Sequence, residues 1–217
     1  VALTMRLAGH LGVLGDRLGV VPAPMASEDL IATVHSPALI EAVTRVGTTP
    51  GAVDLQRGLG TDDNPVFEGM HHAAAHVVGA SVEAFRQVWS GESLHSANIT
   101  GGLHHAMAGN ASGFCIYNDI AVGIQWLLDQ GAQRVAYVDV DVHHGDGVEK
   151  IFWDEPRVLT DFDGEAVNLT FIRRRPEVVA DLLSSSGFRV YAELVRQPDD
   201  DGAESTPQAY LIARRVA

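Results

Sequence analysis

Residues 134–147 read Arg134-Val-Ala-Tyr-Val-Asp-Val-Asp-Val-His-His-Gly-Asp-Gly147, and this stretch decides the fold. Its first eight residues form an apolar, β-branched run, which is typical of a buried parallel strand. A helical pattern that ends at Gly131 precedes the run, and a polar cluster follows it. Helix, glycine, buried strand and polar end together predict an α/β fold, in which ligands bind beyond the carboxyl ends of the strands.

The polar cluster has the composition of a metal site. Side chains alternate along a strand, so Asp139, Asp141 and His143 are expected on one face. Asp141 and His143 can chelate one divalent metal through a carboxylate oxygen and an imidazole nitrogen. A catalytic site of this kind also needs a third protein ligand and an open position for water. The competing interpretation is an acidic loop that caps the next helix.

A second polar group lies in the glycine-led loop Gly101-Gly-Leu-His-His105. Paired histidines in such a loop are candidates for general acid and base chemistry. Each imidazole then needs an acceptor on its other ring nitrogen. Asp139 and Asp146 flank the expected metal ligands, so they can supply two such acceptors.

Two further segments are candidates for substrate contacts. In Ser112-Gly-Phe-Cys115, an exposed Phe114 beside Gly113 could wall a narrow slot for an apolar chain, although composition favours a phenylalanine packed in the core. Cys115 is expected to be buried and unreactive. In the loop around Asp63, a carboxylate could hydrogen-bond a substrate backbone, and the alternative is a solvated acidic loop.

The remaining pattern predicts a helix-rich chain with a second, smaller part. A leucine stripe predicts a helix over 1–19, Ser36-Pro37 predicts a helix start, and Asp119 is expected to cap a helix that ends at Gly131. A short buried strand is expected over 95–100. The expected elements of the tail are a helix from Pro176 to about Ser184 and an antiparallel strand pair over 188–196 and 208–214. A helix over 68–88 is expected to face the core with Ala73, Val77, Ala80, Ala84, Phe85 and Val88, and its His72 and His76 are interpreted as surface or packing residues.

Composition narrows the functional classes. The 217 residues are 46% hydrophobic and 20% charged, which is an ordinary globular composition. A net charge of −13 disfavours nucleic acid and anionic membranes as partners, because their binding depends on basic patches. No apolar stretch is long enough for a transmembrane helix. The single cysteine excludes an internal disulfide and predicts a reducing, cytoplasmic location.

The motifs together resemble those of the histone deacetylase superfamily. The resemblance rests on Gly101-Gly-Leu-His-His105, on Ser112-Gly-Phe-Cys115 with Asn118-Asp119, and on the stretch from Tyr137 to Gly147. It covers roughly residues 1–160 and is closer to the bacterial acetoin utilization branch, which the loop Gly60-Thr-Asp-Asp-Asn-Pro-Val-Phe67 also fits.

This resemblance implies a fold and a reaction. The fold would be the arginase/deacetylase α/β type, a parallel sheet flanked by helices. The reaction would be zinc-dependent, or iron-dependent, hydrolysis of N-acetyl-lysine or a small acetylated amine. Metal ligands would be Asp141 and His143. His104 would pair with Asp139 and His105 with Asp146 beside the reacting water.

The resemblance also implies substrate and cation contacts. Phe114 with Gly113 would form the wall of the acyl-lysine tunnel, and Asp63 would be the rim carboxylate. A structural potassium ion would lie near Asp139, Asp141 and His143. The resemblance implies no oligomeric state.

Some features of the family pattern are missing. The family supplies a third metal ligand, another Asp, and later a Tyr that donates to the oxyanion, and no downstream residue of this sequence sits in a matching context. The expected organisation is therefore a truncated deacetylase-like domain over 1–160 and an unrelated α+β appendage over 161–217. We expect little activity from this chain alone, and the alternative function is an inactive fragment or a metal-binding or interaction module. The tail resembles the C-terminal end of class I methyltransferases, without a glycine-rich cofactor loop.

Overall fold

The structure is a computed structural model that describes residues 2–14, 18–159, 181, 184, 188–196 and 208–215. The chain divides into two compact units, Val1–Glu165 and Ala166–Ala217, and each is described by itself. The described elements of the first unit are α1 (Ala2–His10), α2 (Glu28–Ile31), α3 (Pro37–Thr48), a 3₁₀ turn η1 (Leu55–Arg57), α4 (Met70–Trp89), α5 (Asp119–Asp129), β1 (Val135–Ala136), α6 (Asp146–Phe152) and β2 (Val158–Leu159).

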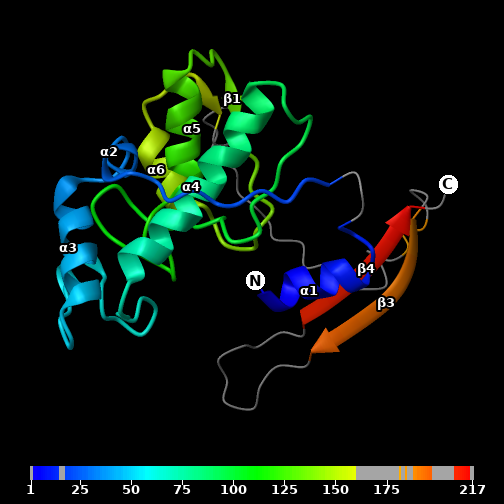
Figure 1. Cartoon of the computed structure of the whole chain (residues 1–217), viewed down its shortest axis with the longest axis horizontal. Helices are drawn as coiled ribbons and strands as arrows, with labels where there is room; N and C mark the ends of the chain where they lie inside the picture. Colours follow the sequence, from blue (N-terminus) through cyan, green and yellow to red (C-terminus); the bar gives the residue numbers. More distant parts are fainter. Residues whose placement is uncertain are drawn as a thin grey trace. The chain divides into compact units, whose positions relative to one another are not determined.

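A layer of packed helices forms the core of the first unit. Helix α4 lies between α3 and α5, and α6 contacts α5 (Figure 1). The predicted start of α3 is confirmed, because the Ser36 hydroxyl accepts the Leu39 N–H at 3.3 Å and Pro37 takes the first helical position. No helix in the described ranges combines the length and apolar character that crossing a bilayer requires.

The predicted core face of α4 is wrong. The helix buries a row shifted by one position from the predicted one, and Val88 is exposed. Small residues in this row let neighbouring segments approach closely, and the backbone N–H of Ala26 bonds to the Ala75 carbonyl at 3.0 Å. Because α4 is rich in alanine, adjacent faces of the helix are similarly hydrophobic. The sequence pattern alone therefore does not predict which face is buried. The buried residues of α4 are Met70, Ala74, Ala75, Val78, Gly79, Ser81 and Val82.

The predicted helix over 1–19 is also wrong in length. Helix α1 ends at His10, and none of its residues is buried. Four leucines of the predicted stripe are exposed, and Leu14 is half-buried. The exposed ones are Leu3, Leu7, Leu11 and Leu18. An amphipathic stripe stabilises a helix mainly when the stripe packs against another surface, and no residue of α1 is buried in such a contact.

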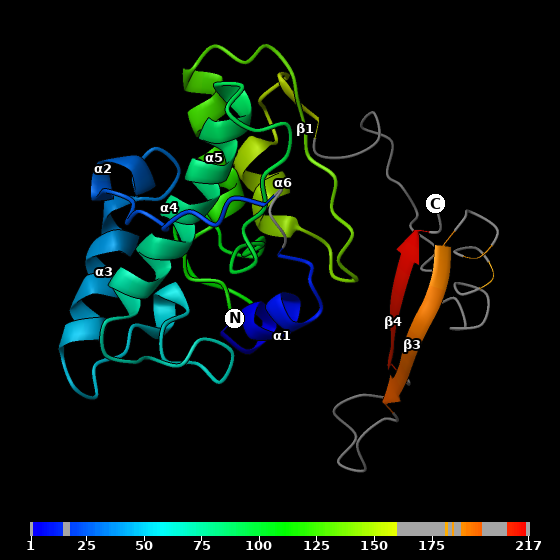
Figure 2. The same ribbon diagram turned by 45° about the vertical axis from the view of Figure 1, so that its right-hand side comes forward.

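The sheet of the first unit is parallel but short. Strands β1 and β2 pair in parallel, with Val135 opposite Val158 and Ala136 opposite Leu159. The strand predicted over 134–141 therefore covers only two residues, and no strand forms over 95–100. After β1 the chain leaves regular secondary structure, bends over residues 141–143 and turns back to α6 (Figure 2). Parallel strands are normally covered on both faces, and among the described residues only β2 pairs with this one.

The second unit contains an antiparallel strand pair, as predicted. Strand β3 (Phe188–Arg196) pairs with β4 (Gln208–Arg215), from Phe188 opposite Arg215 to Arg196 opposite Gln208. The register shifts between Val190 and Ala192. The helix predicted from Pro176 to about Ser184 lies largely outside the described residues.

Candidate functional site

The two neighbouring histidines each meet a carboxylate. His104 Nδ1 lies 2.6 Å from Asp139 Oδ2, and His105 Nδ1 lies 2.6 Å from Asp146 Oδ1. The two imidazole rings stack at a tilt, with centroids 4.2 Å apart. Sequence reasoning expected both pairings, and the structure contains both. Because a carboxylate only accepts, each Nδ1 carries the proton that it donates, and each Nε2 is left as a proton acceptor.

Asp139 is held by more than His104. It also accepts the Tyr137 hydroxyl and, at 2.9 Å, the Asp141 N–H. Burial opposes ionisation of Asp139, but these hydrogen bonds outweigh it and lower its pKa. Burial and the bond to Asp139 raise the pKa of Tyr137, so the phenol stays a donor. Sequence reasoning missed Tyr137, although strand alternation places it on the same face as Asp139.

The first turn of α6 lies against the histidine loop. The Val148 N–H bonds to the His104 carbonyl at 3.2 Å. A side chain at Gly147 would collide with the carbonyl oxygens of His104 and Ala106, so only glycine fits there. This close approach brings Asp146, the first residue of α6, to the ring of His105.

The N-terminus of α5 holds the same loop from the other side. Asn118, which is fully buried, caps α5 by accepting the Ala121 N–H at 3.0 Å. Its amide nitrogen donates to the carbonyls of His104 at 3.2 Å and Ala106 at 3.0 Å. The cap is thus Asn118, and the prediction that Asp119 caps this helix is wrong. Buried His35 adds a further tie, because its Nε2 accepts the Asn118 N–H at 2.9 Å.

Asp119 instead holds the backbone that leads into the histidines. Its carboxylate accepts the N–H groups of Gly102 at 3.2 Å and Leu103 at 2.8 Å, and it also accepts the Ser81 hydroxyl from α4. Asn98 donates to Ser81 Oγ at 2.9 Å. The position of the paired histidines is therefore fixed from α4, α5 and α6 together, which sequence reasoning did not foresee.

The Gly113-Phe114 segment lies against the histidines. A Cβ atom at Gly113 would stand 2.6 Å from His105 Cδ2, so the glycine backbone packs on the face of that ring. Phe114 is 72% exposed and adopts a positive φ of 65°, a strained backbone that proteins keep mainly at functional sites. The composition-based expectation of a core phenylalanine is therefore wrong. Cys115 is buried, and burial raises the pKa of its thiol, which suits packing and not nucleophilic chemistry.

The two expected metal ligands, Asp141 and His143, lie next to each other, and no third ligand from the described residues lies beside them. His143 Nδ1 lies 2.8 Å from Asp141 Oδ1, and the His143 N–H bonds to the same oxygen at 2.7 Å. The ring of His143 is 6.0 Å from that of His105 between centroids. Across the described residues, no group of three or more His, Cys, Asp or Glu side chains is placed to hold a metal ion. The donor types fit zinc or iron, but two protein donors do not complete a catalytic site.

Asp63 is exposed in the loop that follows η1. None of the hydrogen bonds or ion pairs of the described residues joins it to His104 or His105. The neighbouring Asn64 is buried, and its backbone carbonyl accepts the Gly60 N–H at 2.8 Å. The loop is therefore ordered by its own backbone bonds, and Asp63 is left free to face solvent.

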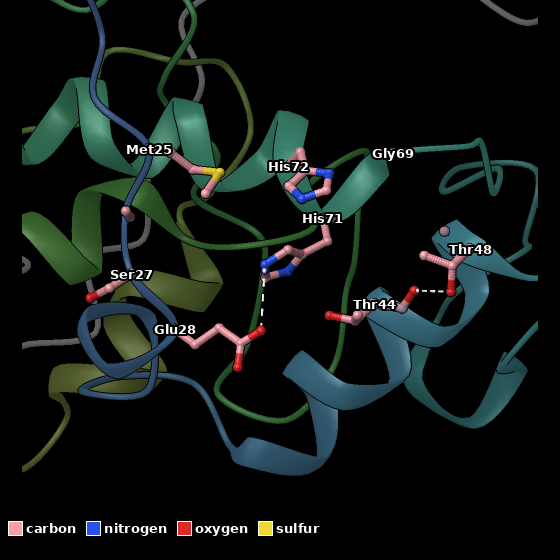
Figure 3. Close-up of a pocket in the computed structure, with 10 residues that line it drawn as sticks. Met25, Ser27, Glu28, Thr44, Thr48, Gly69, His71 and His72 are labelled. Carbon is pink, nitrogen blue, oxygen red and sulfur yellow. Dashed lines mark hydrogen bonds and ion pairs between the residues drawn. The ribbon is translucent and has the colours of Figure 1, made fainter.

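A cavity of about 240 Å³ lies apart from these residues, between the start of α2, α3 and the start of α4 (Figure 3). His71 lines it, with Nδ1 3.0 Å from the Tyr117 hydroxyl and Nε2 3.8 Å from Glu28 Oε1. The Thr44 hydroxyl has no hydrogen-bond partner among the described residues. Burial lowers the pKa of His71 and raises that of Tyr117, so both groups stay neutral and the network is a packing feature of the helical layer.

The comparisons with known proteins agree with this geometry. The histone deacetylase domain family matches residues 2–161. The chain belongs to the histone deacetylase family. It is 46% identical over 162 residues to the acetoin utilization protein AcuC of Bacillus subtilis and 36% identical over 160 residues to AcuC of Staphylococcus aureus. These alignments cover 74% and 73% of this chain but only 42% and 41% of the relatives.

Solved structures give the same family and fold. An HDAC homolog from Aquifex aeolicus superposes with a TM-score of 0.65 and 29% identity, covering 73% of this chain and 42% of that chain. The structure of an HDAC homolog complexed with SAHA gives the same values. The histone deacetylase fold, with its parallel sheet and flanking helices, is therefore confirmed for the first unit. The predicted likeness of the tail to methyltransferases is not borne out by these comparisons, whose family match covers residues 2–161.

Proposed function

We propose that the chain carries part of the site of a metal-dependent deacetylase that hydrolyses N-acetyl-lysine or a small acetylated amine. The observation that carries this proposal is the pair of neighbouring imidazoles, each with its own carboxylate at 2.6 Å. Such a pair supports amide hydrolysis because one proton must leave water and another must reach the amine. Membership of the histone deacetylase family supports the acetylated substrate.

The histidines would move both protons. An imidazole accepts the proton of the attacking water at Nε2, and an imidazole later delivers a proton to the amine nitrogen as the carbon–nitrogen bond breaks. Asp139 and Asp146 hold the Nδ1 protons, which fixes the orientation of both rings. The side chain of His105 is more accessible than that of His104, so we assign the first contact with water to His105.

The described residues supply only part of the proposed metal site. Asp141 and His143 would be two of its ligands, and zinc or iron would suit their oxygen and nitrogen donors. The remaining ligand does not come from the described residues. A structural potassium ion near Asp139, Asp141 and His143 belongs to the same proposal.

The substrate would pass over the Gly113-Phe114 segment. The exposed ring of Phe114 and the flat backbone of Gly113 beside His105 suit an extended aliphatic chain. Asp63 would accept hydrogen bonds from the substrate backbone. The boundary between a deacetylase-like part over 1–160 and an appendage over 161–217 is likewise a proposal.

A second candidate is an inactive fragment or a metal-binding or interaction module. It is favoured by the metal site, to which the described residues contribute two donors. The chain spans about two fifths of the length of its curated relatives. An oxyanion donor alone is worth about 10²–10³ in rate, so we expect this chain by itself to deacetylate weakly or not at all.

Metal content and deacetylation distinguish the two candidates. The purified chain would be assayed on an acetyl-lysine peptide with zinc or iron added, after elemental analysis. His105→Phe should abolish any turnover, and the control His95→Phe, at an exposed position, should keep it. Turnover that survives His105→Phe contradicts the proposed role of the histidines. A metal-free chain without turnover supports the second candidate.

A further inference from the structure

The cavity beside the start of α4 contains three polar groups that face one another. Figure 3 shows the side chains of Glu28, Thr44 and His71 directed into the same space, and all three line the cavity of about 240 Å³. They belong to α2, α3 and α4, so the packing of the helical layer brings them together. We call this space the acceptor cavity, and it is separate from the paired histidines of the proposed deacetylase site.

The Thr44 hydroxyl is a buried polar group that lacks a partner. Nowhere in the described part of the chain does its oxygen meet a hydrogen-bond donor or acceptor. Thr48, one turn later on α3, bonds back to the Thr44 carbonyl at 2.9 Å, and Thr44 makes no such bond to the Ile40 carbonyl. Because an unpaired buried hydroxyl is unfavourable, a ligand that donates to Thr44 gains a hydrogen bond that the protein alone does not make.

His71 supplies a second acceptor. Its Nδ1 lies 3.0 Å from the hydroxyl of Tyr117, which is fully buried. In the tautomer that donates the Nδ1 proton to this hydroxyl, Nε2 carries a lone pair on the other side of the ring. Burial lowers the pKa of His71, which keeps the imidazole neutral and Nε2 able to accept. The bond to Tyr117 therefore packs the helical layer and also fixes the direction of Nε2.

Glu28 supplies a third acceptor, which carries a negative charge. Its Oε1 lies 3.8 Å from Nε2 of His71, which is too long for a hydrogen bond but short enough for one donor atom to reach both. The Glu28 side chain is 66% exposed, so a ligand reaches it from solvent. Met25, Ala26 and Gly47 also line the cavity and give it an apolar wall.

We propose that the acceptor cavity binds a primary ammonium group carried on a short alkyl chain. An alkylammonium ion has three N–H donors and no acceptor, which matches the three acceptors Glu28, Thr44 and His71. Its positive charge is opposite to that of Glu28, and its methylene groups suit the apolar wall beside them. The inference goes beyond the proposed deacetylase function and does not depend on it.

Anions and neutral ligands fit this cavity less well. The first turn of α4 carries a partial positive charge of about half a unit, which by itself favours an anion. The full charge of Glu28 is larger than this partial charge and repels an anion, and the net charge of −13 acts in the same direction. A neutral alcohol offers one donor to three acceptors, so it leaves two of them without a ligand partner.

The test uses n-butylammonium chloride as the probe and the full chain as the protein. Binding would be followed by calorimetry and by nuclear magnetic resonance of the His71 ring, at a constant ionic strength set with sodium chloride. We expect saturable binding with a Kd of about 1–10 mM, because the ligand is small and the ion pair with Glu28 is open to water. The uncharged 1-butanol, which has the same number of non-hydrogen atoms, should bind about tenfold more weakly.

Three variants separate the acceptor cavity from the general charge of the protein. Glu28→Gln keeps the shape of the side chain and should weaken binding of the probe about tenfold, because it removes the charged acceptor. Thr44→Val should weaken binding about threefold, and the fold should tolerate it because it removes an unpaired hydroxyl. Asp29→Asn is the matched control, since it removes the same charge from an exposed neighbour on α2 that does not line the cavity.

The results decide between an ammonium site and its alternatives. Binding that Glu28→Gln and Thr44→Val weaken, and that Asp29→Asn leaves within about twofold, supports the proposal. Absence of saturable binding, or equal effects of Glu28→Gln and Asp29→Asn, overturns it. The proposal is also wrong if 1-butanol or inorganic phosphate shifts the His71 ring at lower concentration than the probe does. These experiments measure binding and not deacetylation, so their failure leaves the proposed deacetylase function to its own test.

Discussion

Asn118 gives the sharpest test of how the histidine loop is held. Its fully buried side chain caps α5 and donates to two carbonyls of the loop. Replacing it by alanine removes all three hydrogen bonds at once. We expect Asn118→Ala to lower the free energy of unfolding and to loosen both His104 and His105.

The change in the free energy of unfolding follows from the backbone groups that lose a hydrogen-bond partner in Asn118→Ala. Loss of the cap on the Ala121 N–H costs about 1 kcal/mol. The His104 carbonyl keeps the Val148 N–H, so its loss is about 0.5 kcal/mol. The buried Ala106 carbonyl accepts no backbone N–H from the described residues, and an unsatisfied buried acceptor costs about 1–3 kcal/mol. Together these losses come to about 3 kcal/mol.

Urea unfolding followed by tryptophan fluorescence or circular dichroism measures this difference. Asn110→Ala is the matched control, because Asn110 lies in the same loop and its amide makes one long bond of 3.5 Å to the Ala111 carbonyl. The control should change the free energy of unfolding by less than about 0.5 kcal/mol. If Asn118→Ala proves no more destabilising than Asn110→Ala, the loop is not held in the way described.

Two further predictions concern pH and packing. Burial lowers the pKa of His35 to about 4, whereas the unfolded chain has the ordinary value of 6.5, so the unfolded state takes up the proton first as pH falls. The free energy of unfolding should therefore drop by about 2 kcal/mol between pH 7 and pH 5, and His35→Gln should remove this part of the slope in urea titrations at the two pH values. Gly113→Ala should destabilise the fold by about 1–2 kcal/mol and shift the His105 ring resonances, because Gly113 has a φ of 49° and touches that ring. Gly109→Ala, with open space around it, should do neither, and an equal effect at both positions would contradict the packing argument.

Local chemistry explains which parts of the fold the sequence predicts. The caps and helix starts depend on residues within one turn of each other, so Ser36-Pro37 predicts α3 correctly. The strand pair of the second unit follows from two apolar runs separated by a polar loop. The pairing of His104 with Asp139 joins residues 35 positions apart, and only the family resemblance predicted it.

The wrong predictions share a different cause. The length of the strand after Arg134 and the burial of its valines depend on neighbours that the described residues do not provide. The leucine stripe of residues 1–19 depends in the same way on a surface to pack against. The hydrophobic pattern of a sequence shows which side chains could be buried. Whether they are buried depends on another part of the protein that packs against them.

The same distinction separates the two halves of the proposed site. The histidine loop is fixed by helices, through Asn118 and Asp119 of the α5 start and through Ser81 of α4. Those contacts join the loop to the described helices, whereas Asp139, the partner of His104, comes from the stretch that follows β1. Asp141 and His143 follow the same short strand, and their hydrogen bonds run to each other and to Asp139. The proton-transfer half of the proposed site is therefore held by more contacts with the helical layer than the metal-binding half.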